Sequence, residues 1–577
     1  MHFAAPSRWI PGISVILLLL ASSGSSQQNP SAVPAPTIRV STRMVLVDVV
    51  VTDKQGNPVP GLHAEDFTVE ENGKAQKIAT FTTSEQMQPA PPLPPGIYSN
   101  RAQYRSPGGP ITVMLLDVIN TAFSDQAYAR RQMLKFVQEQ YKPGQRMAIF
   151  TLTGSLNELQ DFTSDPQVLY AALQRFQPQP QHFTNPGAPT TSASNESGMG
   201  NALVSTNATT APATDAASGL SPGVAQEISN AEAELQGFEN AETEYAEEQR
   251  TVLTLRALDS LGRILGGLPG RKNIIWVTGN LPFSLIPENR NMTDTELAED
   301  LPSRTIHSGD EHAAGNYAAT FRTSHAEEIR ETAARLASAQ VAIYPVDARG
   351  LTISTSNDSQ ELMREMARET GGRAYVNQNE IKFGVQRAFQ DDEATYTLGY
   401  YPENKKWDGK YRTIKVKAKR DGIELQFRRG YYAFDPTQLK GYNPQQEVLS
   451  SLNEVAPSTL VAFTARVVPP SANPTHGKIG VDFLVDASTL STEDVSDGKK
   501  LNVAFYAMVF SPQGKMLGQH SQKVERAFSA DIYKQIVEKG MLLHMDLDPQ
   551  PGGAEIRLAV QDNKSGLVGT INAPLTQ

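Results

Sequence analysis

The stretch Ile111-Thr-Val-Met-Leu-Leu-Asp117-Val-Ile-Asn-Thr121 decides the fold. An apolar, β-branched run ends abruptly at a carboxylate, and a helical pattern begins a few residues later. Such a run is typical of a buried parallel strand. In open α/β sheets, ligands bind just past the carboxyl ends of the strands. The sequence therefore places Asp117, Asn120 and Thr121 at a ligand-binding edge.

Strands and helices alternate through residues 111–394. The predicted strands are short apolar runs: Ile111–Leu116, Arg146–Leu152, Asn273–Thr278 and Val341–Val346. Apolar residues recur at helical spacing between them. The alternation predicts an α/β fold, a Rossmann-like, doubly wound and mostly parallel sheet covered on both faces. Two insertions interrupt it, a low-complexity stretch at 178–245 and a polar loop at 281–324.

The flanking segments show the alternating pattern of β structure. Four units are expected: an N-terminal β-module at 38–83, a Pro-rich linker at 84–110, a β-hairpin module at 395–434 and a C-terminal β-sandwich at 445–577. Asn72-Gly73 is a strong hairpin signal within the first of them. Proline in the linker argues against sheet interior there.

Composition and the N-terminus restrict the function classes. The chain has 577 residues, a net charge of -10 and no cysteine. This length predicts several domains, and the acidity argues against nucleic-acid binding. Residues 1–26 resemble a cleaved signal peptide, with a membrane anchor as the alternative. No later segment is long and apolar enough to span a bilayer. A chain without cysteine forms no disulfides. Together with the predicted export, this favours a secreted, periplasmic or cell-envelope protein of a bacterium.

Several ordered stretches resemble one known family. They are Val50–Val59, Asp66–Gly73, Leu115–Thr121, Asn273–Gly279, Val341–Asp347 and Thr397–Pro402. In this order they resemble the VWFA-related proteins abundant in acidobacteria, in which residues 111–394 correspond to a von Willebrand factor A (VWA) domain. The resemblance spans residues 38 to about 434. It implies a protein-binding or adhesion function without enzymatic activity.

The resemblance also implies a metal site, which this sequence only partly retains. A metal-competent A domain uses an Asp-x-Ser-x-Ser loop, a Thr from a second loop and a later Asp, which together suit Mg²⁺. Asp117 and Thr121 match two positions, whereas Ile119 replaces a Ser. No second-loop Thr is assignable, and Thr278 or Gly279 stands at the later Asp. The expectation is a degenerate site that holds no cofactor or Mg²⁺ only weakly. The alternatives are a loop-ordering role for Asp117 and Asn120 and a metal-free binding surface.

Three further features of the sequence bear on binding sites. The loop His307-Ser-Gly-Asp-Glu-His312 matches no common zinc pattern. Asp347 ends the last predicted strand at the same edge as Asp117, which makes Asn120 and Asp347 candidates for contact with a partner. The basic run Lys415–Arg420 is expected to form the solvent face of a sheet.

No nucleophile elbow, His-Glu-x-x-His motif or phosphate-binding glycine loop occurs in the sequence. The favoured hypothesis is therefore a non-enzymatic, secreted or periplasmic protein that binds an unidentified protein partner. An envelope hydrolase with a site assembled from several loops is one alternative. A scaffold that acts through its β-domains is the other.

Overall fold

The computed structural model describes twelve stretches of the chain: residues 44–83, 92–105, 111–142, 145–180, 222–282, 326–350, 357–377, 381–393, 395–435, 437, 442–473 and 477–575. The predicted signal peptide lies outside the described residues. So do the His307–His312 loop and most of both predicted insertions. Among the described helices, none has the length and apolar character needed to cross a membrane.

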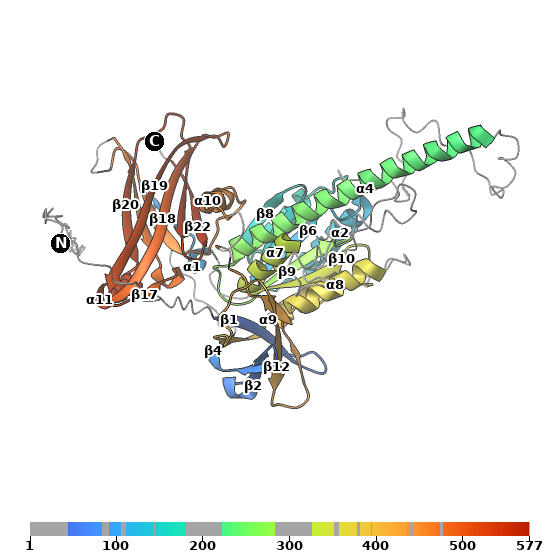
Figure 1. Cartoon of the computed structure of the whole chain (residues 1–577), viewed down its shortest axis with the longest axis horizontal. Coiled ribbons are helices and arrows are strands. Elements are labelled where there is room, and N and C mark those ends of the chain that lie inside the picture. The colour runs from blue at the N-terminus through green and yellow to red at the C-terminus, as the bar shows by residue number, and fades with distance from the viewer. Residues whose placement is uncertain are drawn as a thin grey trace, which may run out of the picture. The chain divides into compact units, whose positions relative to one another are not determined.

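A five-stranded sheet forms the centre of the α/β segment (Figure 1). Its order is β10-β9-β6-β7-β8. The strands are β6 (Ile111–Asp117), β7 (Arg146–Leu152), β8 (Leu156–Thr163), β9 (Lys272–Thr278) and β10 (Val341–Asp347). Neighbouring strands pair in parallel except at β8, which runs antiparallel to β7. The α/β class is thus confirmed with a mixed sheet.

Helices cover this sheet on both faces because its strands are apolar on both faces. Val113 and Leu115 of β6 pack in one core, and the alternate residues Met114 and Leu116 pack in another. The first core includes helices α4 (Pro222–Leu265), α7 (Ala326–Ser338) and α8 (Asn357–Thr370). The second includes α2 (Phe123–Glu139), α3 (Pro166–Arg175) and α9 (Ile381–Glu393).

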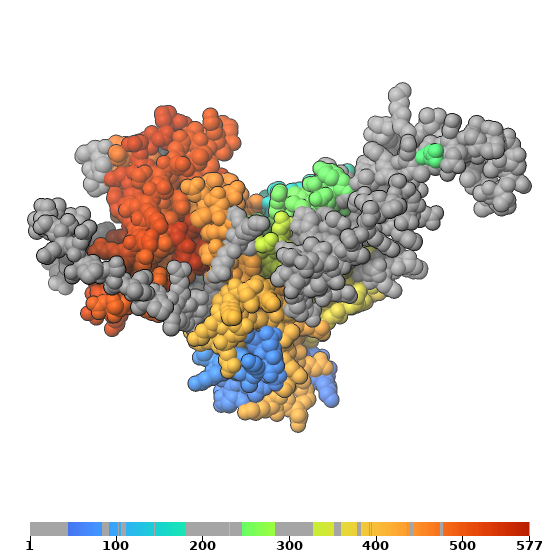
Figure 2. Space-filling model, in the orientation of Figure 1, coloured from blue at the N-terminus to red at the C-terminus, as the bar shows by residue number. Residues whose placement is uncertain are grey.

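The segments 38–83 and 395–434 pair with each other and form one β-module. Its sheets have the orders β13-β1-β11-β4 and β14-β12-β2-β3. The strands are β1 (Val45–Asp53), β2 (Phe67–Glu71), β3 (Lys74–Gln76), β4 (Ile78–Thr83), β11 (Thr395–Tyr400), β12 (Tyr411–Ala418), β13 (Ile423–Gln426) and β14 (Gly430–Tyr432). In Figure 2 the blue and orange surfaces of the two segments adjoin. The prediction of a separate hairpin module at 395–434 is therefore corrected, since its strands bury their apolar faces against β1 and β2 in a shared core.

Two sheets share one apolar core in the C-terminal segment. Their orders are β20-β16-β15-β5 and β17-β18-β21-β22, with β19 also paired to β18. The strands are β5 (Ile97–Ser99), β15 (Phe463–Val468), β16 (Ile479–Val485), β17 (Glu493–Val495), β18 (Gly498–Phe510), β19 (Met516–Ser529), β20 (Met541–Leu547), β21 (Glu555–Asp562) and β22 (Val568–Pro574). Short helices α10 (Pro444–Leu452) and α11 (Ala530–Lys539) accompany them, and α1 (Ala102–Arg105) follows β5.

Part of the predicted Pro-rich linker at 84–110 belongs to a sheet. Its strand β5 pairs with β15 at the edge of a sheet. An edge is where strands flanked by proline are tolerated, because one side of the strand needs no partner.

The basic run of β12 lies where the sequence predicted. Lys415 and Lys417 are exposed, while Ile414 and Val416 alternate with them into the core. Lys417 also pairs with Glu70 on the neighbouring strand β2. The run is therefore the solvent face of a two-sided strand.

Candidate binding site at the carboxyl edge of the sheet

The sequence-predicted site residues meet at one edge of the five-stranded sheet. Asp117 ends β6, Thr278 ends β9 and Asp347 ends β10. The parallel registers pair Leu116 with Val277 and Asp347 with Thr278, which brings these carboxyl ends side by side. We call this region the Asp117 edge. It occupies the position at which open α/β sheets place their ligands.

Asp117 is the centre of a buried hydrogen-bond network, with only 2% of its surface exposed. Its Oδ1 accepts from the backbone N–H of Asn120 at 3.1 Å and from the Asn120 amide at 3.2 Å. Its Oδ2 accepts from the Asn120 amide and from Nε1 of Trp276, each at 2.9 Å. The Thr278 hydroxyl lies 3.0 Å from the same oxygen. The carboxylate therefore joins β6, β9 and the loop after β6.

Asn120 and Thr121 extend this network to other elements. The Asn120 amide donates to the hydroxyl of Thr254 on α4 at 3.1 Å. The Thr121 hydroxyl accepts from the backbone N–H of Gly279 at 2.9 Å. A side chain at 279 would crowd the loop, since an added Cβ would lie 3.1 Å from the Asn120 carbonyl oxygen. Glycine at position 279 therefore allows the loop after β6 to lie close to the end of β9.

The residues present do not fit a magnesium ion. An ionised carboxylate offers about four lone-pair sites, and the contacts from Asn120, Trp276 and Thr278 already use those of Asp117. Ile119 is buried and has no side-chain oxygen to contribute. Nowhere in the described stretches do three His, Asp or Glu side chains gather in a metal-binding arrangement. A cation at Asp117 would have to displace the indole of Trp276 or the amide of Asn120.

Burial raises the pKa of Asp117 to about 6, against hydrogen bonds from Asn120, Trp276 and Thr278 that lower it. Ionisation is thus harder in the folded state than in the unfolded chain, where the carboxyl titrates near 3.8. The contribution of the Asp117 carboxyl group to the free energy of unfolding is therefore complete below pH 3.8, and it is lost as the pH rises through about 6.

We therefore predict that the free energy of unfolding of the wild type falls relative to that of Asp117→Asn between pH 4 and pH 7. A pKa difference of this size corresponds to about 3 kcal/mol. Urea unfolding of both proteins across this range measures the difference. If the free energies of unfolding of the wild type and Asp117→Asn change in parallel with pH, Asp117 does not titrate in the folded state as described.

Asn120 and Asp347, the residues predicted to contact a partner, are buried at the Asp117 edge. Asn120 is 7% exposed and Asp347 is 2% exposed. Asp347 accepts from Nε and Nη2 of Arg349, each at 2.9 Å. Hydrogen bonding to Asp347 is the largest of the effects that raise the pKa of Arg349. The polar groups of Asn120 and Asp347 are thus buried in bonds that order the loops, and their direct contact with a partner stays a prediction.

Sequence reasoning missed several residues of the edge, among them Phe123, Gln126 and Trp276. Phe123, the first residue of α2, is 55% exposed although it is a large apolar side chain. Gln126 is buried and donates to the Thr121 carbonyl oxygen at 2.8 Å. Trp276 reaches Asp117 from a neighbouring strand. Only Phe123 gave a signal in the sequence, as an aromatic residue directly after the Asp117–Thr121 loop.

Comparisons with known proteins assign no family to the chain. No protein-family model and no curated protein matches it. Among solved structures it is similar to the conserved hypothetical protein BatB from Bacteroides thetaiotaomicron, with 12% identity and a TM-score of 0.21, over 49% of this chain and 98% of that one.

Two other solved structures show similarities of the same kind. An aerotolerance-related membrane protein from Bacteroides fragilis has 15% identity and a TM-score of 0.20, over 49% of this chain and 98% of that one. An endonuclease/exonuclease/phosphatase from Beutenbergia cavernae has 9% identity and a TM-score of 0.12, over 32% of this chain and 39% of that one. At such TM-scores these similarities assign neither an activity nor a partner.

Proposed function

We propose that this chain is a secreted or periplasmic, non-enzymatic protein of the bacterial envelope. Residues 111–394 act in it as a von Willebrand factor A-type domain that binds a protein partner at the Asp117 edge. The order of the motifs along the sequence and the helices on both faces of the sheet support this assignment. The degenerate metal loop and the absence of catalytic motifs from the sequence support binding rather than catalysis.

One observation carries the proposal: an exposed aromatic side chain lies beside a loop that buried hydrogen bonds hold in place. Phe123 is 55% exposed, while Asp117, Asn120 and Thr121 are buried next to it. Aromatic and arginine side chains dominate the binding energy of protein interfaces. Arg349, fixed by Asp347, supplies an arginine at the same edge. A preordered loop also lowers the entropy lost on binding.

The partner is expected to bind through Phe123 and to require no divalent cation. The full chain, immobilised through a tag, is incubated with an envelope fraction of the producing bacterium, and bound proteins are quantified by mass spectrometry. Phe123→Ser is expected to weaken capture by about thirtyfold, which corresponds to a contact worth roughly 2 kcal/mol.

Leu542→Ser is the matched control, because Leu542 is also an exposed apolar residue, at 71%, but lies on β20 of the C-terminal segment. Capture should survive this change. Equal capture by the wild type and Phe123→Ser would contradict binding at the Asp117 edge.

A further inference from the structure

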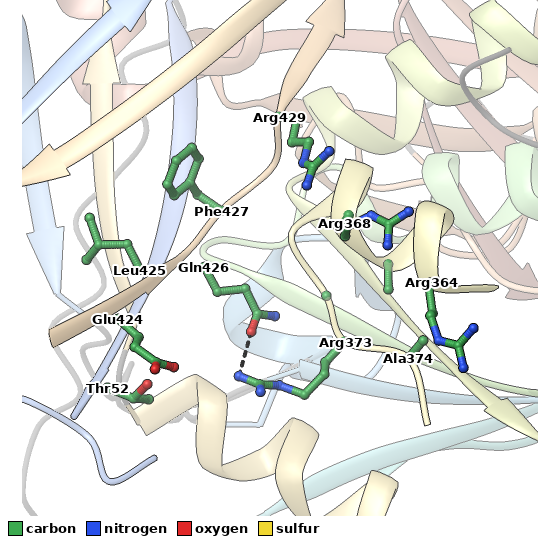
Figure 3. Close-up of a pocket in the computed structure, with 12 residues that line it drawn as sticks. Thr52, Arg364, Arg368, Arg373, Ala374, Glu424, Leu425, Gln426, Phe427 and Arg429 are labelled. Atoms are coloured by element: carbon green, nitrogen blue, oxygen red, sulfur yellow. Dashed lines mark hydrogen bonds between the residues drawn. The ribbon is translucent and has the colours of Figure 1, made fainter. Parts of the chain in front are cut away.

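A hollow of about 570 Å³ lies between α8 and strand β13 (Figure 3). Four arginines line it: Arg364, Arg368, Arg373 and Arg429. Glu424 is the one acidic residue among its lining residues. We call this site the arginine hollow. It is unusual because the chain as a whole is acidic, with a net charge of -10.

Arg364 and Arg368 lie one helical turn apart on α8 and project from the same side (Figure 3). Their side chains are 40% and 41% exposed. Each pairs with Glu361, whose side chain is 58% exposed. Ion pairs this exposed are weak and are screened by salt. The two guanidinium groups therefore keep most of their capacity to bind another anion.

Arg373, which lines the hollow, is held in place by hydrogen bonds. Its Nη2 donates to Oε1 of Gln426 at 2.8 Å, the bond drawn in Figure 3. Gln426 in turn donates to the carbonyl oxygen of Gly371 at 2.9 Å. Gly371 has a φ of 77°, a left-handed conformation suited to glycine, and it directly follows the last residue of α8. Arg373 Nε is buried without an acceptor among the described residues.

Arg429 completes the hollow from the segment after β13. It is exposed, and its guanidinium forms no ion pair with any residue that the structure describes. Guanidinium groups gathered around one hollow repel one another. An unpaired donor on Arg373 and an unpaired cation on Arg429 are therefore groups that a bound anion would satisfy.

We propose that the arginine hollow binds a small ligand that carries two or more oxyanion groups, either phosphates or carboxylates. The planar guanidinium donates two parallel hydrogen bonds to such groups, which explains the use of arginine rather than lysine. The volume falls in the range of small-molecule sites. The proposal is independent of partner binding at the Asp117 edge.

The test is calorimetric titration of the full-length chain at pH 7 and constant ionic strength, with pyrophosphate in one series and citrate in another. Arg368→Gln/Arg429→Gln is expected to raise the Kd of the bound anion at least tenfold. These two side chains are exposed, so the variant should fold. Arg466→Gln, an exposed arginine on β15, is the matched control and should bind as the wild type does.

The two series also identify the ligand class. Binding of pyrophosphate alone indicates a phosphate ligand, binding of citrate alone indicates a carboxylate ligand, and similar binding of both indicates recognition of oxyanion charge. Arg368→Lys/Arg429→Lys should recover only part of the affinity, because lysine keeps the charge but loses the paired donors. The proposal is overturned if neither anion binds below about 10 mM, or if the glutamine variant binds as tightly as the wild type.

Discussion

Replacement of Asp117 by alanine is expected to lower the free energy of unfolding of the α/β segment by about 3–5 kcal/mol. The change leaves the Asn120 amide, the Trp276 indole and the Thr278 hydroxyl without their acceptor in a buried site. Each unsatisfied buried donor costs roughly 1–3 kcal/mol. Removal of a buried charge offsets part of the sum, since burial already disfavours the ionised form.

Urea unfolding followed by tryptophan fluorescence measures this effect, because Trp276 is itself a partner of Asp117. Asp497→Ala is the matched control: Asp497 is an exposed aspartate in the C-terminal segment, and its loss should change stability by less than about 0.5 kcal/mol. A loss below about 1 kcal/mol for Asp117→Ala would show that the network does not hold the edge together.

The second large effect is expected for Arg412→Met in the β-module, a loss of about 3–5 kcal/mol. Arg412 is 1% exposed and lies 3.4 Å from the carboxylate of Glu71. It also donates to the carbonyl oxygens of Asn404, at 2.8 Å, and Lys406. Its removal leaves a buried carboxylate without its cation. Since Glu71 and Arg412 belong to the two distant chain segments, the change should weaken their association.

Lys417→Met provides the comparison for this prediction. Lys417 and Glu70 also pair between β12 and β2, but on the solvent face. No measurable loss is expected there, because exposed ion pairs contribute little. Denaturant unfolding followed by the fluorescence of Trp407, which lies 5.6 Å from the Arg412 guanidinium, reports on the module. Equal effects of the two substitutions would contradict the argument that burial makes the Arg412 pair indispensable.

The central strands could be predicted closely from the sequence. The runs at 111–116, 146–152, 273–278 and 341–346 match β6, β7, β9 and β10 to within one residue. A parallel strand buried on both faces is a continuous apolar run, which few other structures produce. Strand β8 was missed because its sequence, Leu-Asn-Glu-Leu-Gln-Asp-Phe-Thr, is mostly polar. Antiparallel edge strands can be half-exposed, and their pattern is weaker.

The β-module could not be predicted as one unit. Val45 pairs with Tyr400, and Val50 pairs with Gln426. Each strand alternates in a way that fits a local hairpin equally well, and nothing local indicates a partner so far along the chain. Pairing at this distance is decided by complementary apolar faces in the folded core.

The Asp117 edge was predictable in position but not in chemistry. The end of an apolar run located Asp117, Asn120 and Thr121 correctly at the edge. Their bonds depend on Trp276, Thr278 and Thr254, which come from other elements. These tertiary contacts turn a loop that resembles a metal site into one held by hydrogen bonds.

The most direct test of metal-independent partner binding at the Asp117 edge is the capture measurement, performed with the wild type in EDTA and in Mg²⁺. We predict the same partner and the same yield in both conditions, since the oxygens of Asp117 already accept from Asn120 and Trp276. Capture that requires Mg²⁺ and disappears on conversion of Asp117 to asparagine would contradict the account, because it would assign Asp117 to a bound metal.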